Sequence, residues 1–108
     1  MARILLVDDD PDQLEIRKRI VEAAGHEVRT AATKSEAFEK FLGCRLVIMD
    51  LHLPELSDGL ELIHAVTGSA RVIVLSGDDA PAGVQVDEFL LKPCPSRRLL
   101  DAVSRLCR

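Results

Sequence analysis

The sequence predicts an α/β fold in which one parallel sheet of five strands is covered by helices on both faces. Two observations predict this class. Short apolar segments alternate with longer amphipathic segments along the chain, which is the pattern of successive βαβ units. Four of the short segments are continuously apolar, as strands are when both faces of a sheet are covered. Neither a linker nor a repeat interrupts the pattern, so residues 1–108 are expected to form one domain.

Five segments are expected to be strands. Four of them are the apolar runs Ile4–Val7, Leu46–Met49, Val72–Leu75 and Phe89–Leu91. The fifth, His26–Thr30, alternates polar and apolar residues, and Val28 is its single large hydrophobic residue. A strand of this composition is expected at the edge of the sheet, where it is less completely covered.

The first helix is expected between Asp10 and Gly25. Asp10 followed by Pro11 supplies a capping side chain and a proline at the first helical position, and Gly25 ends the segment. The apolar side of this helix consists of Leu14, Val21 and Ala24, with Ile20 at its margin. Arg17 interrupts that apolar side.

Three further helices are expected. Thr33 and Glu36 have the spacing of a capping box, and Gly43 ends the helix that follows them. The apolar side of this second helix consists of Ala37, Phe38, Phe41 and Leu42. The third helix is expected to open at Asp58-Gly59 and to end near Gly68, and the last to begin near Pro95 and to carry Leu99, Val103 and Leu106 at helical spacing.

The connection between the fourth and fifth strands is too short for a full helix. If the fifth strand begins near Val86, residues 77–85 remain for the crossover, and they include Pro81 and Gly83. Returning along a strand of about six residues takes roughly 20 Å, and nine extended residues reach at most about 30 Å. The helix is therefore expected to be missing here or to be a single turn.

The composition excludes several classes of function. Lys and Arg number 14 against 18 Asp and Glu, a net charge of −4, which argues against a nucleic-acid-binding chain. The apolar runs are too short to span a membrane. Three cysteines, without zinc-ligand spacing, indicate reduced thiols and a cytoplasmic location, and none of them has a neighbour in the sequence that would mark it as a catalytic nucleophile.

Polar residues follow each central strand of the predicted sheet. Asp8 and Asp9 follow the first apolar run, and Asp50, Ser76 and Lys92 follow the later ones. The carboxyl ends of parallel strands share one edge of the sheet, which is where ligands bind in such folds. Carboxylate oxygens suit Mg²⁺, a lysine suits a phosphoryl anion, and an aspartate can accept a phosphoryl group as an acyl phosphate. The sequence therefore predicts a phosphoryl-accepting site at this edge.

These residues resemble the receiver domain of two-component response regulators, of the kind found in chemotaxis regulators. Four motifs carry the resemblance, in order over essentially the whole chain: Val7-Asp8-Asp9-Asp10, Val47 to Pro54 with Asp58-Gly59 after it, Val74-Leu75-Ser76-Gly77, and Phe89-Leu90-Leu91-Lys92-Pro93. The resemblance implies a flavodoxin-like, doubly wound five-stranded parallel sheet with strand order 2-1-3-4-5. It also implies a cis peptide bond between Lys92 and Pro93.

The resemblance further implies a role for each site residue. Asp50 would be the phosphorylated residue. The cofactor would be Mg²⁺, held directly by Asp9 and Asp50, by Asp8 largely through water, and by the backbone carbonyl of His52. Lys92 and Ser76 would bind the phosphoryl group, and Phe89 would be the aromatic residue that turns inward when Ser76 moves.

The function implied is a phosphoacceptor signalling switch rather than an enzyme of metabolism, although such a switch can catalyse its own phosphorylation and dephosphorylation. The implied partners are a histidine kinase or phosphotransfer protein and an unidentified downstream protein. The oligomeric state stays open, as does the choice between a stand-alone receiver and one excised from a longer regulator or hybrid kinase. The alternative is a receiver-like module that binds partners without being phosphorylated.

The sequence departs from the receiver pattern at three places. One extra residue lies between Pro54 and Asp58-Gly59, Gly77 stands where alanine is commoner, and the fourth-helix region is shortened. The shortened region puts the Phe89 switch and dimerisation through that face in doubt. His52 also invites comparison with a cobalamin-binding Asp-x-His-x-x-Gly motif, but Glu55 occupies the position of the required glycine.

Overall fold

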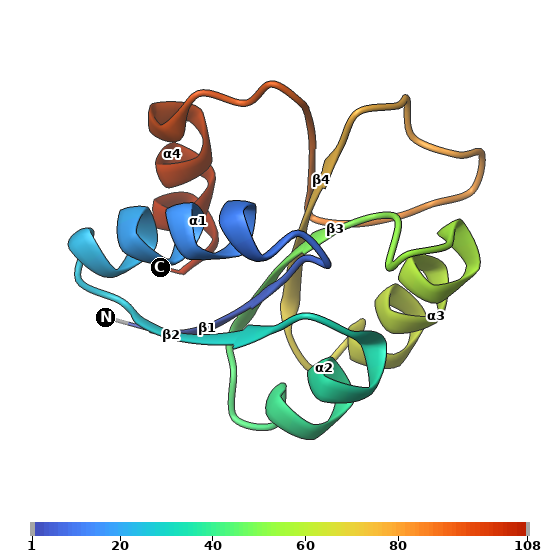
Figure 1. Cartoon of the computed structure of the whole chain (residues 1–108), viewed down its shortest axis with the longest axis horizontal. Helices are drawn as coiled ribbons and strands as arrows, with labels where there is room; N and C mark the ends of the chain where they lie inside the picture. The colour runs from blue at the N-terminus through green and yellow to red at the C-terminus, as the bar shows by residue number, and fades with distance from the viewer. Residues whose placement is uncertain (1, 108) are drawn as a thin grey trace.

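A computed structural model describes residues 2–107 and has the predicted α/β architecture (Figure 1). Five parallel strands form one sheet in the order β2-β1-β3-β4-β5, so both the flavodoxin-like fold class and the strand order are confirmed. The elements in chain order are β1 (Arg3–Val7), α1 (Pro11–Ala23), β2 (Glu27–Ala31), α2 (Lys34–Lys40), β3 (Leu46–Asp50), α3 (Leu56–Val66), β4 (Arg71–Ser76), β5 (Glu88–Leu91) and α4 (Ser96–Leu106).

The hydrophobic core has two halves, one on each face of the sheet. Alternate residues of the central strands point to opposite faces: Leu5 and Val47 pack on the side of α2 and α3, whereas Ile4 and Ile48 pack on the side of α1 and α4. Figure 1 shows the two helix pairs on opposite sides of the sheet. Because β1, β3 and β4 are covered on both faces, their sequences are continuously apolar, while β2 lies at the edge as predicted.

The first two helices begin where the sequence predicts. The Asp10 carboxylate accepts hydrogen bonds from the backbone amides of Asp12 (3.0 Å) and Gln13 (3.4 Å) and so caps α1. The Thr33 hydroxyl accepts from the backbone amide of Glu36 at 3.1 Å. The Glu36 carboxylate accepts in turn from Ala32 rather than from Thr33, at 2.9 Å. Both caps are local, which is why the sequence shows them.

Three details of the predicted helices are wrong. Helix α3 begins at Leu56 rather than at Asp58, because Asp58 lies in its first turn and accepts a hydrogen bond from the amide of Glu55 at 3.3 Å. Helix α2 ends at Lys40, so Leu42 lies beyond it and is 78% exposed, and Phe38 points mainly outward. Ala24 caps the end of α1 and is exposed rather than part of its buried side.

The connection between β4 and β5 contains no α-helix, which confirms the prediction (Figure 1). Val84 and Val86 from this connection pack against the core on the α2 and α3 side. Asp87 holds its end to the sheet, since its carboxylate accepts from the Val72 amide at 2.8 Å and its own amide donates to the Val72 carbonyl at 3.1 Å. The two valines, held in place by the hydrogen bonds of Asp87, thus cover the part of the sheet that a helix would otherwise cover.

Amide hydrogen exchange in residues 78–85 is expected to be at least about tenfold faster than in α4. Among these residues the backbone amides that donate hydrogen bonds are those of Asp78, to the Ser76 hydroxyl, and Val84, to the Pro81 carbonyl. Exchange followed by mass spectrometry or NMR would check this expectation. Protection equal to that of α4 would show that the connection is an ordered element of comparable stability.

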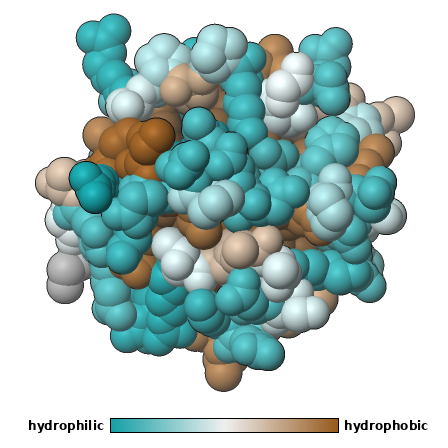
Figure 2. All heavy atoms as spheres, viewed as in Figure 1, coloured by the Kyte–Doolittle hydropathy of each residue, from teal (hydrophilic) through white to brown (hydrophobic). Residues whose placement is uncertain are grey.

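The surface is mixed in polarity. Figure 2 shows separate hydrophobic patches between hydrophilic side chains on the face it presents. Within residues 2–107, no helix combines the length and the apolar character needed to cross a membrane. The Lys92–Pro93 peptide bond is cis, as the resemblance implies, and Leu53–Pro54 is a second cis bond that the sequence did not indicate.

Candidate functional site

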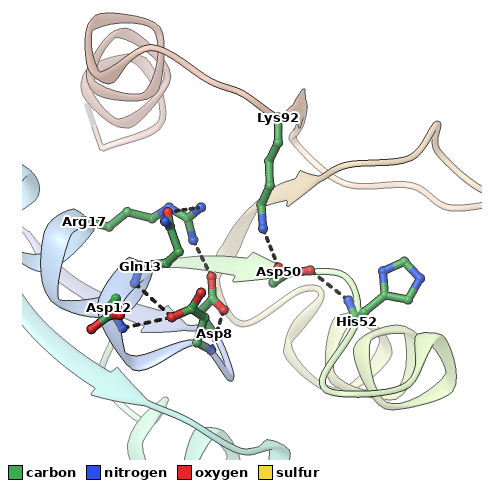
Figure 3. Close-up of polar contacts among 8 residues, drawn as sticks. Asp8, Asp12, Gln13, Arg17, Asp50, His52 and Lys92 are labelled. Carbon is green, nitrogen blue, oxygen red and sulfur yellow. Dashed lines mark hydrogen bonds and ion pairs between the residues drawn. The ribbon is translucent and has the colours of Figure 1, made fainter.

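Parallel register brings the predicted site residues to one edge of the sheet. Val7 pairs with Met49, so the residues that follow them, Asp8 and Asp50, lie at the ends of adjacent strands. Ser76 pairs with Leu91 at the ends of β4 and β5, and Lys92 comes next in the chain. Figure 3 shows the side chains of Asp8, Asp50 and Lys92 converging from three different segments.

Asp50 is held by two donors. Its Oδ2 lies 2.6 Å from the Nζ of Lys92, and its Oδ1 accepts a hydrogen bond from the backbone amide of His52 at 3.0 Å. The side chain of Asp50 is 14% exposed and that of Lys92 is 30% exposed, so the pair is open to solvent on one side. The amide of Lys92 also donates to the carbonyl of Ser76 at 2.8 Å, which fixes the start of the lysine loop. The Asp50 carboxylate is therefore accessible from solvent and already lies against its counter-ion, the Lys92 ammonium.

Asp8 is held by a cation that the sequence analysis did not assign to the site. Its Oδ1 accepts from the backbone amide of Asp10 at 2.9 Å, and its Oδ2 lies 2.5 Å from the Nη1 of Arg17. The Asp8 side chain is only 3% exposed. One indication of this contact is present in the sequence, because Arg17 interrupts the apolar side of α1. The spacing of residues could not predict that its partner is the buried Asp8.

The remaining predicted residues are less closely involved in this arrangement. Asp9 is exposed beside Asp8. Ser76 is fully buried, and its hydroxyl accepts from the amide of Asp78 at 3.1 Å. The imidazole of His52 is directed away from the carboxylates, while its backbone amide contacts Asp50 (Figure 3). Phe89 is partly buried on the α2 and α3 side of the sheet.

The donor set suits a hard divalent cation. Asp8, Asp9, Asp50 and the backbone carbonyl of His52 offer only oxygen, and Mg²⁺ typically binds through one or two carboxylates while keeping several waters. Among residues 2–107, however, no three His, Cys, Asp or Glu side chains are gathered closely enough to hold a metal ion. The chemistry therefore fits Mg²⁺, whereas the buried carboxylate of Asp8 and the partly exposed carboxylate of Asp50 are each held by a basic side chain.

The loop after Asp50 is supported by a close approach of α3. A Cβ atom at Gly59 would lie 1.7 Å from the carbonyl oxygen of Leu51, so glycine is required there by space rather than by backbone angles. Lys34 adds a link from α2 to the start of α3 through Asp58 at 2.9 Å. The hydrogen bond from Lys34 lowers the pKa of the Asp58 carboxyl below its ordinary value.

The three cysteines are free thiols. Cys44 is buried, and burial raises the pKa of its thiol. Burial also raises the pKa of Cys94 and of Cys107. Burial therefore favours the thiol over the reactive thiolate at each of them.

Comparison with known proteins identifies relatives over the whole fold. Residues 4–104 match the family described as the response regulator receiver domain. The transcriptional regulatory protein PrrA of Mycobacterium leprae is 33% identical over 117 aligned residues, covering 98% of this chain and 50% of PrrA. The CpxR homologue of Haemophilus influenzae is 30% identical, covering 100% of this chain and 51% of that protein. The chain thus spans about half the length of these curated relatives.

A solved structure with similar architecture is the response regulator protein TrrA of Thermotoga maritima in complex with Mg²⁺ and BeF. It superposes with a TM-score of 0.86 and 30% identity, covering 98% of this chain and 99% of that one.

Proposed function

The chain belongs to the response regulator receiver domain family, and we propose that it acts as a phosphoacceptor switch in a two-component phosphorelay. Residues 1–108 constitute the receiver domain in this proposal. Asp50 accepts the phosphoryl group from a histidine kinase or phosphotransfer protein, in the cytoplasm, and the altered surface binds a downstream protein. The chain is a signalling switch and turns over no separate metabolic substrate.

The Asp50–Lys92 pair is the observation that carries this proposal. Asp50 is partly accessible at the end of β3, with the Lys92 ammonium 2.6 Å from its Oδ2. In the proposed step a carboxylate oxygen attacks phosphorus, the bond from phosphorus to the donor atom breaks, and the donor leaves with that electron pair. Lys92 then has a phosphoryl oxygen to pair with in place of the carboxylate oxygen.

The other predicted residues act around the same centre. Magnesium would neutralise part of the phosphoryl charge. It would be held by Asp8, Asp9, Asp50 and the backbone carbonyl of His52. The Ser76 hydroxyl, which accepts from the Asp78 amide, would donate its hydrogen to a phosphoryl oxygen. Movement of Ser76 toward the phosphoryl group would shift the start of the β4–β5 connection and change the surface near Phe89; added charge would in this way favour one of two conformations.

Intact-mass measurement after incubation with acetyl phosphate tests this function. With Mg²⁺ present, we expect a gain of one phosphoryl group, and with EDTA we expect little or none. Addition of hydroxylamine should remove the group, since an acyl phosphate is labile to it.

A chain that gains no mass with acetyl phosphate or with phosphorylated histidine kinases, although it binds Mg²⁺, would contradict the switch and favour the alternative of an unphosphorylated docking module. One feature favours that alternative: the buried carboxylate of Asp8, which a magnesium site would use, is already paired with the basic side chain of Arg17.

A further inference from the structure

Arg17 is the one charged side chain on the inner side of α1 that reaches the site. Its guanidinium extends from the helix to the Asp8 carboxylate, while Lys92 reaches Asp50 from a different element (Figure 3). The Arg17 side chain is 13% exposed, against 78% for Arg19 two residues later, which pairs with Glu15 on the outer face of the same helix. Arg17 is thus part of the site, and Arg19 is not.

The contact occupies an oxygen of Asp8 that a cation, or a water bound to the cation, would need. One oxygen of Asp8 accepts from the Asp10 amide and the other from Arg17. A carboxylate that is only 3% exposed requires a compensating charge. Arg17 provides that charge and also offsets the repulsion between Asp8 and the neighbouring Asp50.

We propose that Arg17 is a built-in competitor of the divalent cation at the acidic site. Its guanidinium neutralises Asp8 in the metal-free protein and must move away from Asp8 when Mg²⁺ binds. Arg17 therefore stabilises the metal-free state and weakens Mg²⁺ binding. This inference deepens the proposed function and rests on it, because it takes the acidic site to be the site of Mg²⁺.

Two arguments favour displacement over simultaneous binding. A guanidinium and a dication at the same carboxylate repel each other strongly where water is largely excluded. The Asp8 side chain is nearly inaccessible, and its Oδ2 is the oxygen that Arg17 holds. Mg²⁺ also requires a regular octahedral shell that includes several waters, and a guanidinium in contact with Asp8 occupies part of that volume.

The structure provides a place for the displaced side chain. A cavity of about 560 Å³ adjoins Arg17; apolar side chains of α1, β4 and α4 form part of its wall, and Gln13, Lys92 and Ser96 form part of its polar lining. The apolar part of the wall can cover the methylene stem of the arginine while its charged end stays near solvent. The Oε1 of Gln13 already accepts a hydrogen bond from Nη2 of Arg17 at 3.4 Å, so one partner remains available after displacement.

Calorimetric titration with MgCl₂ tests the proposal directly. The variant Arg17→Met keeps the stem and removes the charge, and we expect it to bind Mg²⁺ about tenfold more tightly or better than the wild type. Arg19→Met is the matched control, since it removes the same charge from the exposed face of α1, and it should bind within about twofold of the wild type. Arg17→Lys keeps a positive charge at this position, so its Mg²⁺ affinity should be close to the weaker affinity of the wild type.

Thermal unfolding gives a second readout that is independent of phosphorylation. In EDTA, Arg17→Met should unfold at a lower temperature than the wild type, because Asp8 is left buried without a counter-ion. Saturating Mg²⁺ should narrow or abolish that difference, because the cation replaces the missing charge. A merely structural arginine would give the same difference in both conditions.

Wild-type protein supplies a test that does not depend on any variant folding. The ¹⁵N resonances of the Arg17 guanidinium should change on Mg²⁺ titration with the same midpoint as the calorimetric isotherm. Equal Mg²⁺ affinity in wild type and Arg17→Met, or guanidinium resonances that Mg²⁺ leaves unchanged, would overturn the competition and leave the phosphoacceptor proposal standing. Absence of Mg²⁺ binding in every variant would overturn the competition together with the magnesium part of the proposed function.

Discussion

Replacement of Asp50 by asparagine is expected to abolish phosphoryl uptake altogether. The amide has no anionic oxygen to attack phosphorus, and the neighbouring Asp8 is buried and paired with Arg17 rather than with Lys92. Stability should change by no more than about 1 kcal/mol, because Lys92 is 30% exposed and can be solvated when its partner is neutral. Intact-mass measurement with acetyl phosphate and Mg²⁺, with urea unfolding in parallel, would check both expectations.

Asp101→Asn is the matched control for this substitution. Asp101 lies on the exposed side of α4, away from the sheet edge, so the same chemical change should leave phosphoryl uptake at the wild-type level. If Asp50→Asn took up as much phosphoryl group as Asp101→Asn, another residue would be the acceptor. A mass gain mapped by peptide analysis to Asp8 or Asp9 would identify that residue.

Replacement of Gly59 by alanine is expected to destabilise the fold by about 3 kcal/mol or more. The added Cβ would lie 1.7 Å from the carbonyl oxygen of Leu51 and 2.7 Å from its carbonyl carbon. Both partners are backbone atoms, so neither a rotamer change nor a flexible side chain can relieve the overlap. Either α3 or the loop after Asp50 has to move, and the urea midpoint should fall accordingly.

Gly77→Ala is the control for this prediction, because a Cβ at Gly77 meets nothing within 4 Å and its backbone lies outside the left-handed region. Its stability should be unchanged or higher by about 0.4–1 kcal/mol. A Gly59→Ala variant as stable as Gly77→Ala would mean that α3 can withdraw from the loop at little cost. In that case the position of His52 next to Asp50 would not depend on this contact.

Local features of the fold could be predicted from the sequence because their causes are local. The capping carboxylate of Asp10 acts on amides two and three residues away, and the continuous apolar runs follow directly from a sheet covered on both faces. The absent helix between β4 and β5 could be predicted by counting residues against the length of a strand. The start of α3 shows the limit: Asp58 suits an N-cap, but it lies in the first turn of the helix and accepts from the Glu55 amide instead.

The acidic site was partly predictable. Parallel strands end at a common edge, so residues after β1, β3 and β5 were expected to meet, and the contact between Asp50 and Lys92 follows that logic. Ser76 ends β4 at the same edge, yet its hydroxyl accepts from the amide of Asp78 in the loop that follows. The order of the strands places a residue at the carboxyl edge of the sheet. The direction of its side chain depends on its own rotamer and on the loop that follows the strand.

What the sequence determined by itself is the architecture and the inventory of chemical groups at the sheet edge, because periodicity, caps and strand ends are properties of neighbouring residues. Only the tertiary structure decided which cation each carboxylate meets. The contacts of Asp8 with Arg17 and of Gly59 with Leu51 depend on the rotation and depth of α1 and α3 against the sheet. Packing of the whole core sets those quantities to within about an ångström. A shift of that size is enough to break a hydrogen-bonded ion pair or to turn a close contact into an overlap.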